Sequence, residues 1–388
     1  MDHAIWWHVY PLGFAGCDVT GHERAAREPD AFARLTGWLD YAVRLGVSGI
    51  ALGPVFDSAT HGYDTVDHYR IDTRLGSVEG FERFVSEAHG RGLRVLLDGV
   101  FNHVGRDFSA GDSSWLTGRV FEGHSSLPEL DHSNPAVADY VAGVMDHWLA
   151  RGADGWRLDA AYAVDPAFWS RVLPVVRAAH PAAWFVGEVI HGDYADYVAR
   201  SGLDSVTQYE LWKAVWSSLG DGNLFELAWA LGRHNDFLDS FVPLTFVGNH
   251  DVTRLASRLG DRRLLGVALA VLLTVGGTPS IYYGDEQAFE GVKEERSGGD
   301  DQVRPAFPLT EAGLAPYGQD VYRVHQELIG LRRRNPWLHR ARTEVVALAN
   351  RAMTYDAVDP DGKGTLRVTL DLDSDPGWRV SGPGAGAG

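Results

Sequence analysis

Cysteine is almost absent from this sequence. Cys17 is the only one among 388 residues, so no internal disulfide can form, and zinc or iron–sulfur sites built on several cysteines are excluded. No segment approaches the roughly 20 unbroken apolar residues that a membrane helix needs. The N-terminus also lacks a basic stretch followed by an apolar run and a small-residue cleavage site. We therefore expect a cytoplasmic protein that does not bind membranes.

Positive charge is scarce as well. Lys and Arg number 35 against 52 Asp and Glu, which gives a formal net charge of −17. Nucleic acid phosphates demand a basic face, so this balance argues against nucleic acid as a partner. The hydrophobic content of 45% and the charged content of 22% are ordinary for a globular protein. The length suits a large barrel with small attachments rather than one small core.

Short apolar strands alternate with amphipathic helices over most of the chain, which indicates repeated β/α units and a parallel sheet. Eight strands are predicted, at Ile5–Tyr10, Gly49–Val55, Leu93–Asp98, Gly155–Asp159, Trp184–Glu188, Asp204–Gln208, Leu244–Val247 and Pro279–Tyr283. Eight helices are predicted, at Ala31–Leu45, Val78–His89, Pro135–Arg151, Pro166–Ala179, Leu211–Leu219, Leu224–Leu238, Arg263–Thr274 and Gly318–Arg334. These counts predict the α/β class and a (β/α)₈ TIM barrel.

Two segments depart from this alternation. Residues 104–134 are rich in Gly, Ser and Asp without clear periodicity, which is typical of a long functional excursion after the third strand. From about residue 336 the pattern turns to strand-like alternation, at Glu344–Leu348 and Thr365–Leu370. We therefore expect a catalytic barrel over 1–103 and 135–335, a short excursion over 104–134, and a small C-terminal β region over 336–388 with a disordered Gly/Ala-rich tail, 382–388.

Polar residues at the carboxyl ends of the strands are the candidates for a site, because the active sites of such barrels lie there. The candidates that end or follow the third, fourth, fifth and seventh strands are Asp98, Asn102, His103, Arg157, Asp159, Glu188, Asn249, His250 and Asp251. A single Asp at a strand end is commonly a helix cap. Three carboxylates on different strands, with an arginine and two histidines, instead indicate one catalytic mouth.

This set suits glycoside hydrolysis, in which one carboxylate attacks and a second, kept protonated, donates a proton to the leaving oxygen. Arg157 stands two residues before Asp159, and a close opposite charge lowers the pKa of a carboxyl, so we expect Asp159 to be ionised. Repulsion among the acids would then keep one of them protonated, and we expect that one to be Glu188.

Four segments carry a family resemblance. They are DGVFNH (Asp98–His103), GWRLDAA (Gly155–Ala161), GEV (Gly187–Val189) and FVGNHD (Phe246–Asp251). In this order they resemble the four signature motifs of the α-amylase family of retaining glycoside hydrolases (glycoside hydrolase family 13). The likeness extends from Trp6 to about Arg334. The motif sequences are most similar to those of the cyclomaltodextrinase/neopullulanase-like branch, although we expect this chain to lack that branch's N-terminal domain.

The resemblance implies a role for each matching residue. The catalytic residues would be Asp159 as nucleophile, Glu188 as general acid/base and Asp251 as the carboxylate that stabilises the transition state. The substrate-binding residues would be Tyr63, Asp98, His103, Arg157, His250, Asp300 and Arg304. Two alternatives stay open: Tyr63 as a loop aromatic that covers the core, and Asp98 as a purely structural ion-pair partner of Arg157.

The sequence departs from the family at the acceptor side and at the excursion. Many α-amylases carry Lys and His three and four residues after the nucleophile, where this chain has Tyr162 and Ala163. Those acceptor contacts are therefore not carried over.

Typical members also bind a structural calcium near the residue matching Asn102, and calcium needs several oxygen ligands. Asp107, Asp112 and Asp131 could contribute, but their spacing singles out none, and a solvated acidic loop is the favoured interpretation. We therefore predict no metal-ligating residue and no required cofactor, with calcium as an alternative.

The leading hypothesis is a retaining hydrolase of small α-glucans, such as maltooligosaccharides or cyclic dextrins, because a short excursion leaves a smaller cleft. A transglycosylase, such as a 4-α-glucanotransferase or a disaccharide isomerase, shares the glycosyl-enzyme intermediate and is the first alternative. A catalytically inactive binding or scaffold protein is the second. The partner is an oligosaccharide substrate. Linkage preference, chain length and oligomeric state are left open.

Overall fold

The computed structural model describes residues 3–20, 30–296, 298–373 and 375–385. Within these residues, eight parallel strands lie in the spatial order β10-β9-β8-β5-β2-β1-β12-β11. They are β1 (Trp6–Val9), β2 (Gly49–Leu52), β5 (Arg94–Gly99), β8 (Gly155–Leu158), β9 (Trp184–Gly187), β10 (Ser205–Val206), β11 (Leu244–Phe246) and β12 (Thr278–Tyr282). A parallel bridge between Thr207 and Leu244 joins the two ends of this order. The sheet therefore closes, and the predicted TIM barrel is confirmed.

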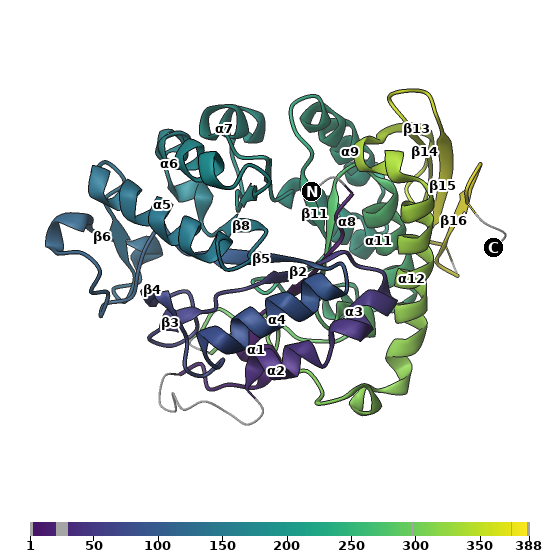
Figure 1. Ribbon diagram of the computed structural model, residues 1–388. Coiled ribbons are helices and arrows are strands. Elements are labelled where there is room, and N and C mark those ends of the chain that lie inside the picture. Colours follow the sequence, from purple (N-terminus) through teal and green to yellow (C-terminus); the bar gives the residue numbers. More distant parts are fainter. Residues whose placement is uncertain (1–2, 21–29, 297, 374, 386–388) are drawn as a thin grey trace.

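Helices surround the barrel (Figure 1). They are α1 (Pro11–Ala15), α2 (Ala31–Thr36), α3 (Leu39–Leu45), α4 (Val78–Gly90), α5 (Pro135–Leu149), α6 (Pro166–Ala179), α7 (Tyr194–Ser201), α8 (Tyr209–Asp221), α9 (Phe225–Leu238), α10 (Leu255–Leu259), α11 (Arg263–Thr274) and α12 (Gln319–Arg334). α6 begins where Asp165 accepts a hydrogen bond from the Ala167 amide, with Pro166 in the first turn. In the part of the chain that is described, no helix combines the length and the apolar character needed to cross a membrane.

The predicted helix series differs from the described helices at several places. Ala31–Leu45 is not one helix, because a turn at Gly37 and Trp38 separates α2 from α3. α7, between β9 and β10, was not predicted, and neither were α1 and α10, whereas α8 and α9 lie between β10 and β11, where two helices were predicted. α7 is amphipathic, but with eight residues it is too short for its helical pattern to stand out in the sequence.

The excursion after β5 is a short hairpin. It holds a 3₁₀ turn, η1 (Ser113–Trp115), then β6 (Leu116–Val120), a second turn, η2 (Phe121–Gly123), and β7 (Pro128–Leu130). A bridge between His103 and Glu129 joins β7 to the segment that follows β5. A second hairpin, β3 (Phe56–Ser58) and β4 (Thr65–Ile71), follows β2 and was not predicted. Both hairpins belong to loops that leave the carboxyl ends of barrel strands.

A four-stranded antiparallel sheet follows the turn η7 (Pro336–Arg340). Its strands are β13 (Arg342–Leu348), β14 (Ala352–Val358), β15 (Thr365–Asp371) and β16 (Gly377–Ser381). β13 and β15 were predicted, whereas β14 and β16 were missed. The sheet packs on α9 and α11 (Figure 1). Of the tail expected to be disordered, residues 386–388 lie outside the described residues, and the Gly384 carbonyl lies 3.3 Å from Nδ2 of Asn335.

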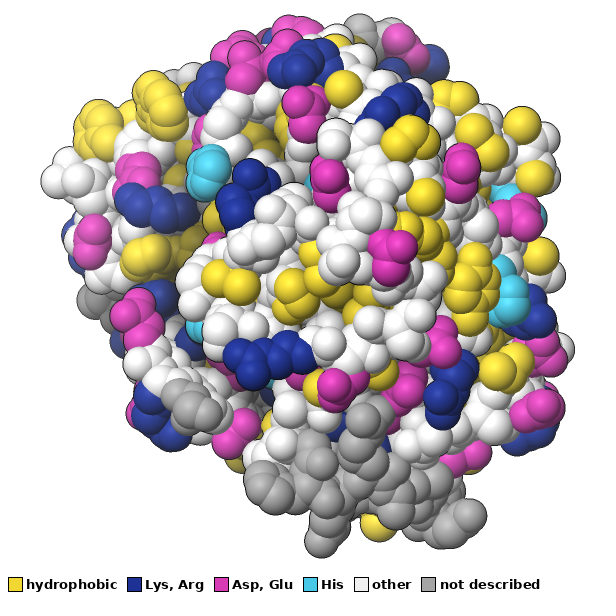
Figure 2. Space-filling view, turned by 90° about the vertical axis from the view of Figure 1, so that its left-hand side faces the viewer, with side chains coloured by type: hydrophobic (Ala, Val, Ile, Leu, Met, Phe, Trp, Pro, Cys, Tyr) yellow, Lys and Arg dark blue, Asp and Glu magenta, His cyan; other side chains and the backbone are white. Residues whose placement is uncertain are grey.

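Apolar side chains fill the barrel interior away from the carboxyl ends of the strands, and the mouth at those ends is polar. The inner set is Ala4, Trp6, Ala51, Leu96, Val186, Leu244 and Phe246. Trp6 is completely buried and stacks on Trp184, with ring centroids 5.9 Å apart. A larger apolar layer lies between the strands and the helices. On the outside, acidic and basic side chains are interspersed with small hydrophobic patches over the face that carries the excursion (Figure 2). The barrel thus presents one polar mouth, at the carboxyl ends of the strands.

Candidate active site

Arg157 is the centre of the polar mouth. Its Nη1 atom donates to both carboxylate oxygens of Asp98, each at 2.8 Å, and to Oδ1 of Asp159 at 2.9 Å. Its Nη2 atom lies 2.7 Å from Oε1 of Glu188. The three acids come from the ends of β5, β8 and β9, which are neighbours in the sheet. One guanidinium therefore holds together three carboxylates that are far apart in the sequence.

Glu188 receives two further hydrogen bonds. The backbone amide of Ala160 donates to Oε2 at 3.0 Å, and the Tyr209 hydroxyl donates to Oε1 at 3.1 Å. Ala160 has φ 46°, in the left-handed region that few residues other than glycine adopt. This turn directs the amide after Asp159 toward Glu188. Asn249 donates to the Tyr209 hydroxyl at 2.9 Å and so orients it.

Tyr63, Asp98 and His250 form a compact group beside this centre. The Tyr63 hydroxyl donates to Oδ2 of Asp98 at 3.1 Å and contacts Nε2 of His250. The Tyr63 and His250 rings are parallel within 2°, with centroids 5.2 Å apart. His103 joins the group through Nε2, which lies 3.0 Å from the Tyr63 carbonyl oxygen. All four side chains are held in place by other parts of the site.

Asp251 completes the predicted set from the loop after β11. Nη2 of Arg304 donates to its Oδ1 at 2.8 Å and lies 3.0 Å from Oδ2 of Asp300. Nε2 of His250 lies 3.0 Å from the other Asp251 oxygen. Lys293 lies 3.5 Å from Asp300. The predicted Asp300 and Arg304 pair therefore does reach the mouth, through Asp251.

The pKa values of the carboxyls diverge. Burial raises the pKa of Asp159 well above its ordinary value, and Glu188 and Asp98 add to this effect while Arg157 opposes it. Arg157 thus acts in the expected direction, although burial outweighs it. The ionised nucleophile stays a prediction. Burial also raises the pKa of Asp98, against Arg157.

For Asp251, burial is outweighed by His250 and Arg304, which hold its pKa well below the ordinary value. The protonated state of Glu188 stays a prediction.

These residues surround a cavity of about 470 Å³, within the range of ligand pockets. Its lining residues are His61, Tyr63, His103, Phe121, Glu122, His124, Ser126, Leu127, Asp159, Ala160, Tyr162, Glu188, Ile190, Tyr209, Asp251, Val252, Lys293, Asp300 and Arg304. Asp98 lies beneath this lining, while Arg157 and His250 line a smaller cavity of about 40 Å³ inside the barrel. All ten predicted site residues are therefore brought together.

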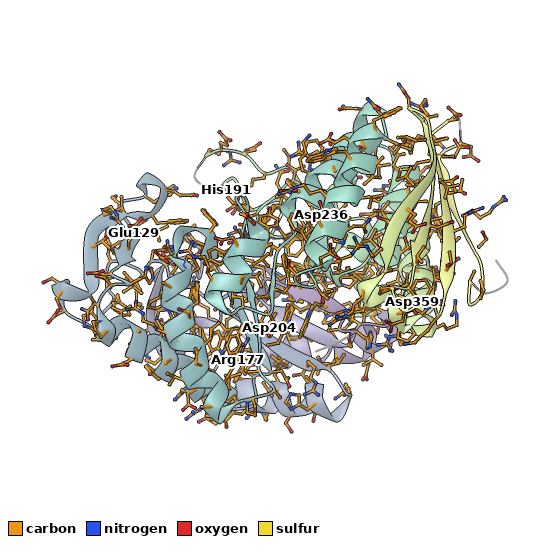
Figure 3. All side chains as sticks on the ribbon, turned by 90° about the horizontal axis from the view of Figure 1, so that it is seen from above. Glu129, Arg177, His191, Asp204, Asp236 and Asp359 are labelled. Atoms are coloured by element: carbon orange, nitrogen blue, oxygen red, sulfur yellow. The ribbon has the colours of Figure 1, made fainter. Side chains whose placement is uncertain are left out.

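Sequence reasoning missed several residues of the cavity. Tyr209 directly follows the sixth predicted strand, Asp204–Gln208, and this place at a strand end is a signal that could have identified it. Phe121 and Glu122 lie on η2 of the excursion, and no pattern marked them. In the view from above, His191 lies between the excursion, marked by Glu129, and α9, marked by Asp236 (Figure 3). These loop residues reach the mouth only through tertiary packing.

The residues considered for calcium have other partners. Nδ2 of Asn102 lies 3.2 Å from Nδ1 of His103, while Asp112 and Asp131 accept hydrogen bonds from the serines two positions later. Over the described ranges, no group of three or more His, Cys, Asp and Glu side chains is placed to hold a metal ion. The residues present do not fit the implied calcium site, and the chemistry below uses no metal.

A family model described as the catalytic domain of alpha amylase matches residues 8–118 and 111–338 of the chain. A cyclomaltodextrinase from a Bacillus species is 28% identical over 420 aligned positions, which take in 96% of this chain and 73% of the relative. Neopullulanase 2 from Thermoactinomyces vulgaris is 31% identical over 380 positions, 86% of this chain and 64% of the relative. Part of each relative thus has no counterpart here.

Solved structures give the same fold. The ligand-free cyclic α-maltosyl-(1→6)-maltose hydrolase of Arthrobacter globiformis has a TM-score of 0.83 at 24% identity, covering 99% of this chain and 97% of that one. A cyclomaltodextrinase structure has a TM-score of 0.81 at 26% identity, covering 95% of this chain and 70% of that one. The barrel and the C-terminal sheet together therefore have counterparts of known structure.

Proposed function

This chain belongs to the alpha-amylase family of glycoside hydrolases, and from that premise we propose that it hydrolyses small α-glucans with retention of configuration. Maltooligosaccharides and cyclic dextrins are the proposed substrates. The names of the relatives, a cyclomaltodextrinase and a neopullulanase, support this substrate class. The short hairpin of the excursion and the limited cavity support small substrates over polymeric starch.

The single observation that carries the proposal is the contact of one guanidinium with both Asp159 and Glu188. Retaining glycosidases hold their two carboxyl groups roughly 5–5.5 Å apart, because the nucleophile must reach the anomeric carbon while the acid reaches the leaving oxygen. Inverting enzymes need a wider gap for a water molecule. A bridge through Arg157 favours the closer pair.

In the proposed mechanism, Asp159 attacks the anomeric carbon and Glu188 gives a proton to the leaving oxygen. The glycosidic bond breaks, and a covalent glycosyl-Asp159 ester forms. Glu188, now a carboxylate, then takes a proton from water, whose oxygen attacks the same carbon and releases Asp159. Asp251, ionised because its pKa is held low, hydrogen-bonds sugar hydroxyls as positive charge develops on the ring.

Tyr63 lines the cavity and is 9% exposed, so the exposed part of its ring would pack on the sugar whose bond is broken. His103, Arg304 and Asp300 would contact hydroxyls of that sugar or its neighbour. Asp98 and Arg157 are bonded from below and act by orienting the two carboxyls.

The test is a substrate panel with the wild-type protein and Asp159→Asn. The panel contains maltose, maltotriose, isomaltose, panose, trehalose, cyclomaltoheptaose and soluble starch. We expect release of short sugars from maltotriose or cyclomaltoheptaose by the wild type, and none by Asp159→Asn. If the wild type cleaves no α-glucan, or if Asp159→Asn keeps its activity, the proposal is wrong.

The stereochemistry gives a second test. Proton NMR at early times should show the α-anomer as the first product, and a β-anomer would exclude retention. The same samples separate hydrolysis from transfer, because products longer than maltotriose appear only when a sugar hydroxyl replaces water.

A further inference from the structure

Tyr162 and Glu122 meet across two loops at the mouth of the cleft. The Tyr162 hydroxyl donates to Oε1 of Glu122 at 2.7 Å. Tyr162 belongs to the loop after β8, and Glu122 belongs to η2 at the tip of the excursion after β5. Because β5 and β8 are adjacent strands, this hydrogen bond joins two neighbouring loops into one continuous wall of the cavity.

The wall adjoins Glu188, the residue proposed to protonate the leaving group. Glu188 gives its proton to the leaving oxygen, and the Tyr162 amide donates to the Glu188 carbonyl at 3.1 Å. Tyr162 also faces the His191 ring, at a centroid distance of 5.4 Å, on the loop after β9. The residues proposed to hold the donor sugar make their own hydrogen bonds with one another, for example Arg304 with Asp251, and none of these bonds involves the wall.

The tip of the excursion is anchored to the centre of the site. Phe121 stacks on His103 at 4.5 Å with an interplanar angle of 11°, and its amide donates to the Leu127 carbonyl at 2.9 Å. Glu122, the next residue, has φ 48°, a conformation that a residue with a side chain adopts only at some cost in free energy. The chain therefore turns sharply at Glu122 and presents its carboxylate to Tyr162.

We propose that the hydrogen bond between Tyr162 and Glu122 closes the leaving-group end of the cleft against long glucan chains, so that this pair selects short leaving groups over polymer. The proposal rests on the proposed function, because it needs an α-glucan as substrate. The hydrogen bond ties the two loops together, and this closes the path that a polymer would have to take between them. It leaves room for one or a few sugars inside the cavity.

Three variants test the wall through the ratio of kcat/KM for soluble starch to kcat/KM for maltotriose. Tyr162→Phe keeps the ring and removes the donor, and Glu122→Gly removes the acceptor at a position whose φ suits glycine. Each should raise the ratio by about threefold to tenfold, the fold-change that corresponds to one lost hydrogen bond. Glu122→Gln keeps an acceptor oxygen and should keep the wild-type ratio.

Arg119→Gln is the matched control. It breaks the ion pair of Arg119 with Glu129, at 2.8 Å on the same hairpin, where the Arg119 side chain is 75% exposed and outside the cavity lining. Its ratio should equal that of the wild type. If Tyr162→Phe and Glu122→Gly give the ratio of Arg119→Gln, the wall does not select substrates.

Hydrolysis of α-maltosyl fluoride by the wild type separates a failure of the proposed function from a failure of the proposed wall. Its leaving group is a single atom, so the leaving-group wall does not limit it. A wild type that cleaves neither this compound nor any glucan overturns the proposed function. A wild type that cleaves both, with an unchanged ratio in the two wall variants, overturns only the wall.

Discussion

On the donor side of the cleft, charged side chains hold one another through short bonds. On the leaving-group side, aromatic rings, backbone hydrogen bonds and the side-chain hydrogen bond of Tyr162 with Glu122 hold the loops. Asp98 is completely buried, and Asp159 and Glu188 are each 7% exposed, all three in contact with Arg157. On the other side, Glu122 is exposed and Tyr162 is half-buried.

The difference follows from what each side has to do. Stabilisation of a charged transition state needs dipoles and charges fixed in advance, in a site that excludes water. Recognition of a leaving group needs shape more than charge, and loops can change shape without unfolding the barrel. In the proposed function, the strand ends therefore carry the chemistry, and the loops after β5, β8 and β9 carry the choice of substrate.

The largest expected difference between the two sides is in the rate of bond cleavage. Asp159→Asn should lower kcat for α-maltosyl fluoride by about 10⁴-fold or more, because the covalent step loses its nucleophile. Tyr162→Phe should change the same kcat by less than about tenfold, the scale of one hydrogen bond. Steady-state release of fluoride measures both. Comparable losses in the two variants would remove the distinction between chemistry and selection.

Arg304→Met should give the next largest effect. It removes the donor that, with His250, outweighs burial and holds the pKa of Asp251 low. The pKa of Asp251 should therefore rise toward that of Asp159, and the acid limb of the kcat/KM profile should steepen and move to higher pH as both carboxyls titrate on it. At neutral pH we expect kcat/KM to fall by about tenfold to hundredfold, as for a lost bond to a charged group.

Arg304→Lys is the control for this change. It keeps the positive charge but loses the planar guanidinium, which can bond two acceptors at once. The affinity for the substrate should therefore fall, while the acid limb stays near its wild-type position. An acid limb that does not move in Arg304→Met would show that Asp251 does not control it.

Tyr209→Phe tests a contact of the proposed general acid, because the Tyr209 hydroxyl donates a hydrogen bond to Glu188. The general acid matters most for a poor leaving group. We expect kcat for maltotriose to fall by about threefold to tenfold, the scale of one hydrogen bond, and kcat for α-maltosyl fluoride to change less. Equal effects on the two substrates would place Tyr209 outside the proton transfer.

The donor side could be predicted from the sequence because a parallel barrel forces the ends of its strands to one mouth. Once Gly155–Asp159 and Trp184–Glu188 are strands, Asp159 and Glu188 must be neighbours there. The third and seventh strands bring Asp98 and Asp251 to the same place by the same geometry.

The leaving-group side could not be predicted, because its contacts depend on how loops fold against one another. Nothing in the local sequence around Phe121 and Glu122 indicates that η2 lies against Tyr162. α7 was missed for a related reason, since a helix of eight residues is stabilised mainly by tertiary packing, whereas the short strand β10 lies within the predicted strand Asp204–Gln208. The net pKa of Asp159 required the depth of its burial, which no spacing of residues reveals.

The smallest expected effect is on stability, and it has opposite signs on the two sides. Burial raises the pKa of Asp159 above its unfolded value of about 3.9. The stability that comes from its neutral form is therefore complete below that pH and is lost as pH rises through the folded pKa. At pH 7, Asp159→Asn removes the cost of the buried charge and should raise Tm by about 1–4 °C, a gain that shrinks toward pH 4. Tyr162→Phe loses a hydrogen bond and should lower Tm slightly at both pH values. Calorimetry at pH 4 and pH 7 measures both changes, and a lower Tm of Asp159→Asn at pH 7 would mean that Arg157 stabilises the ionised nucleophile more than burial destabilises it.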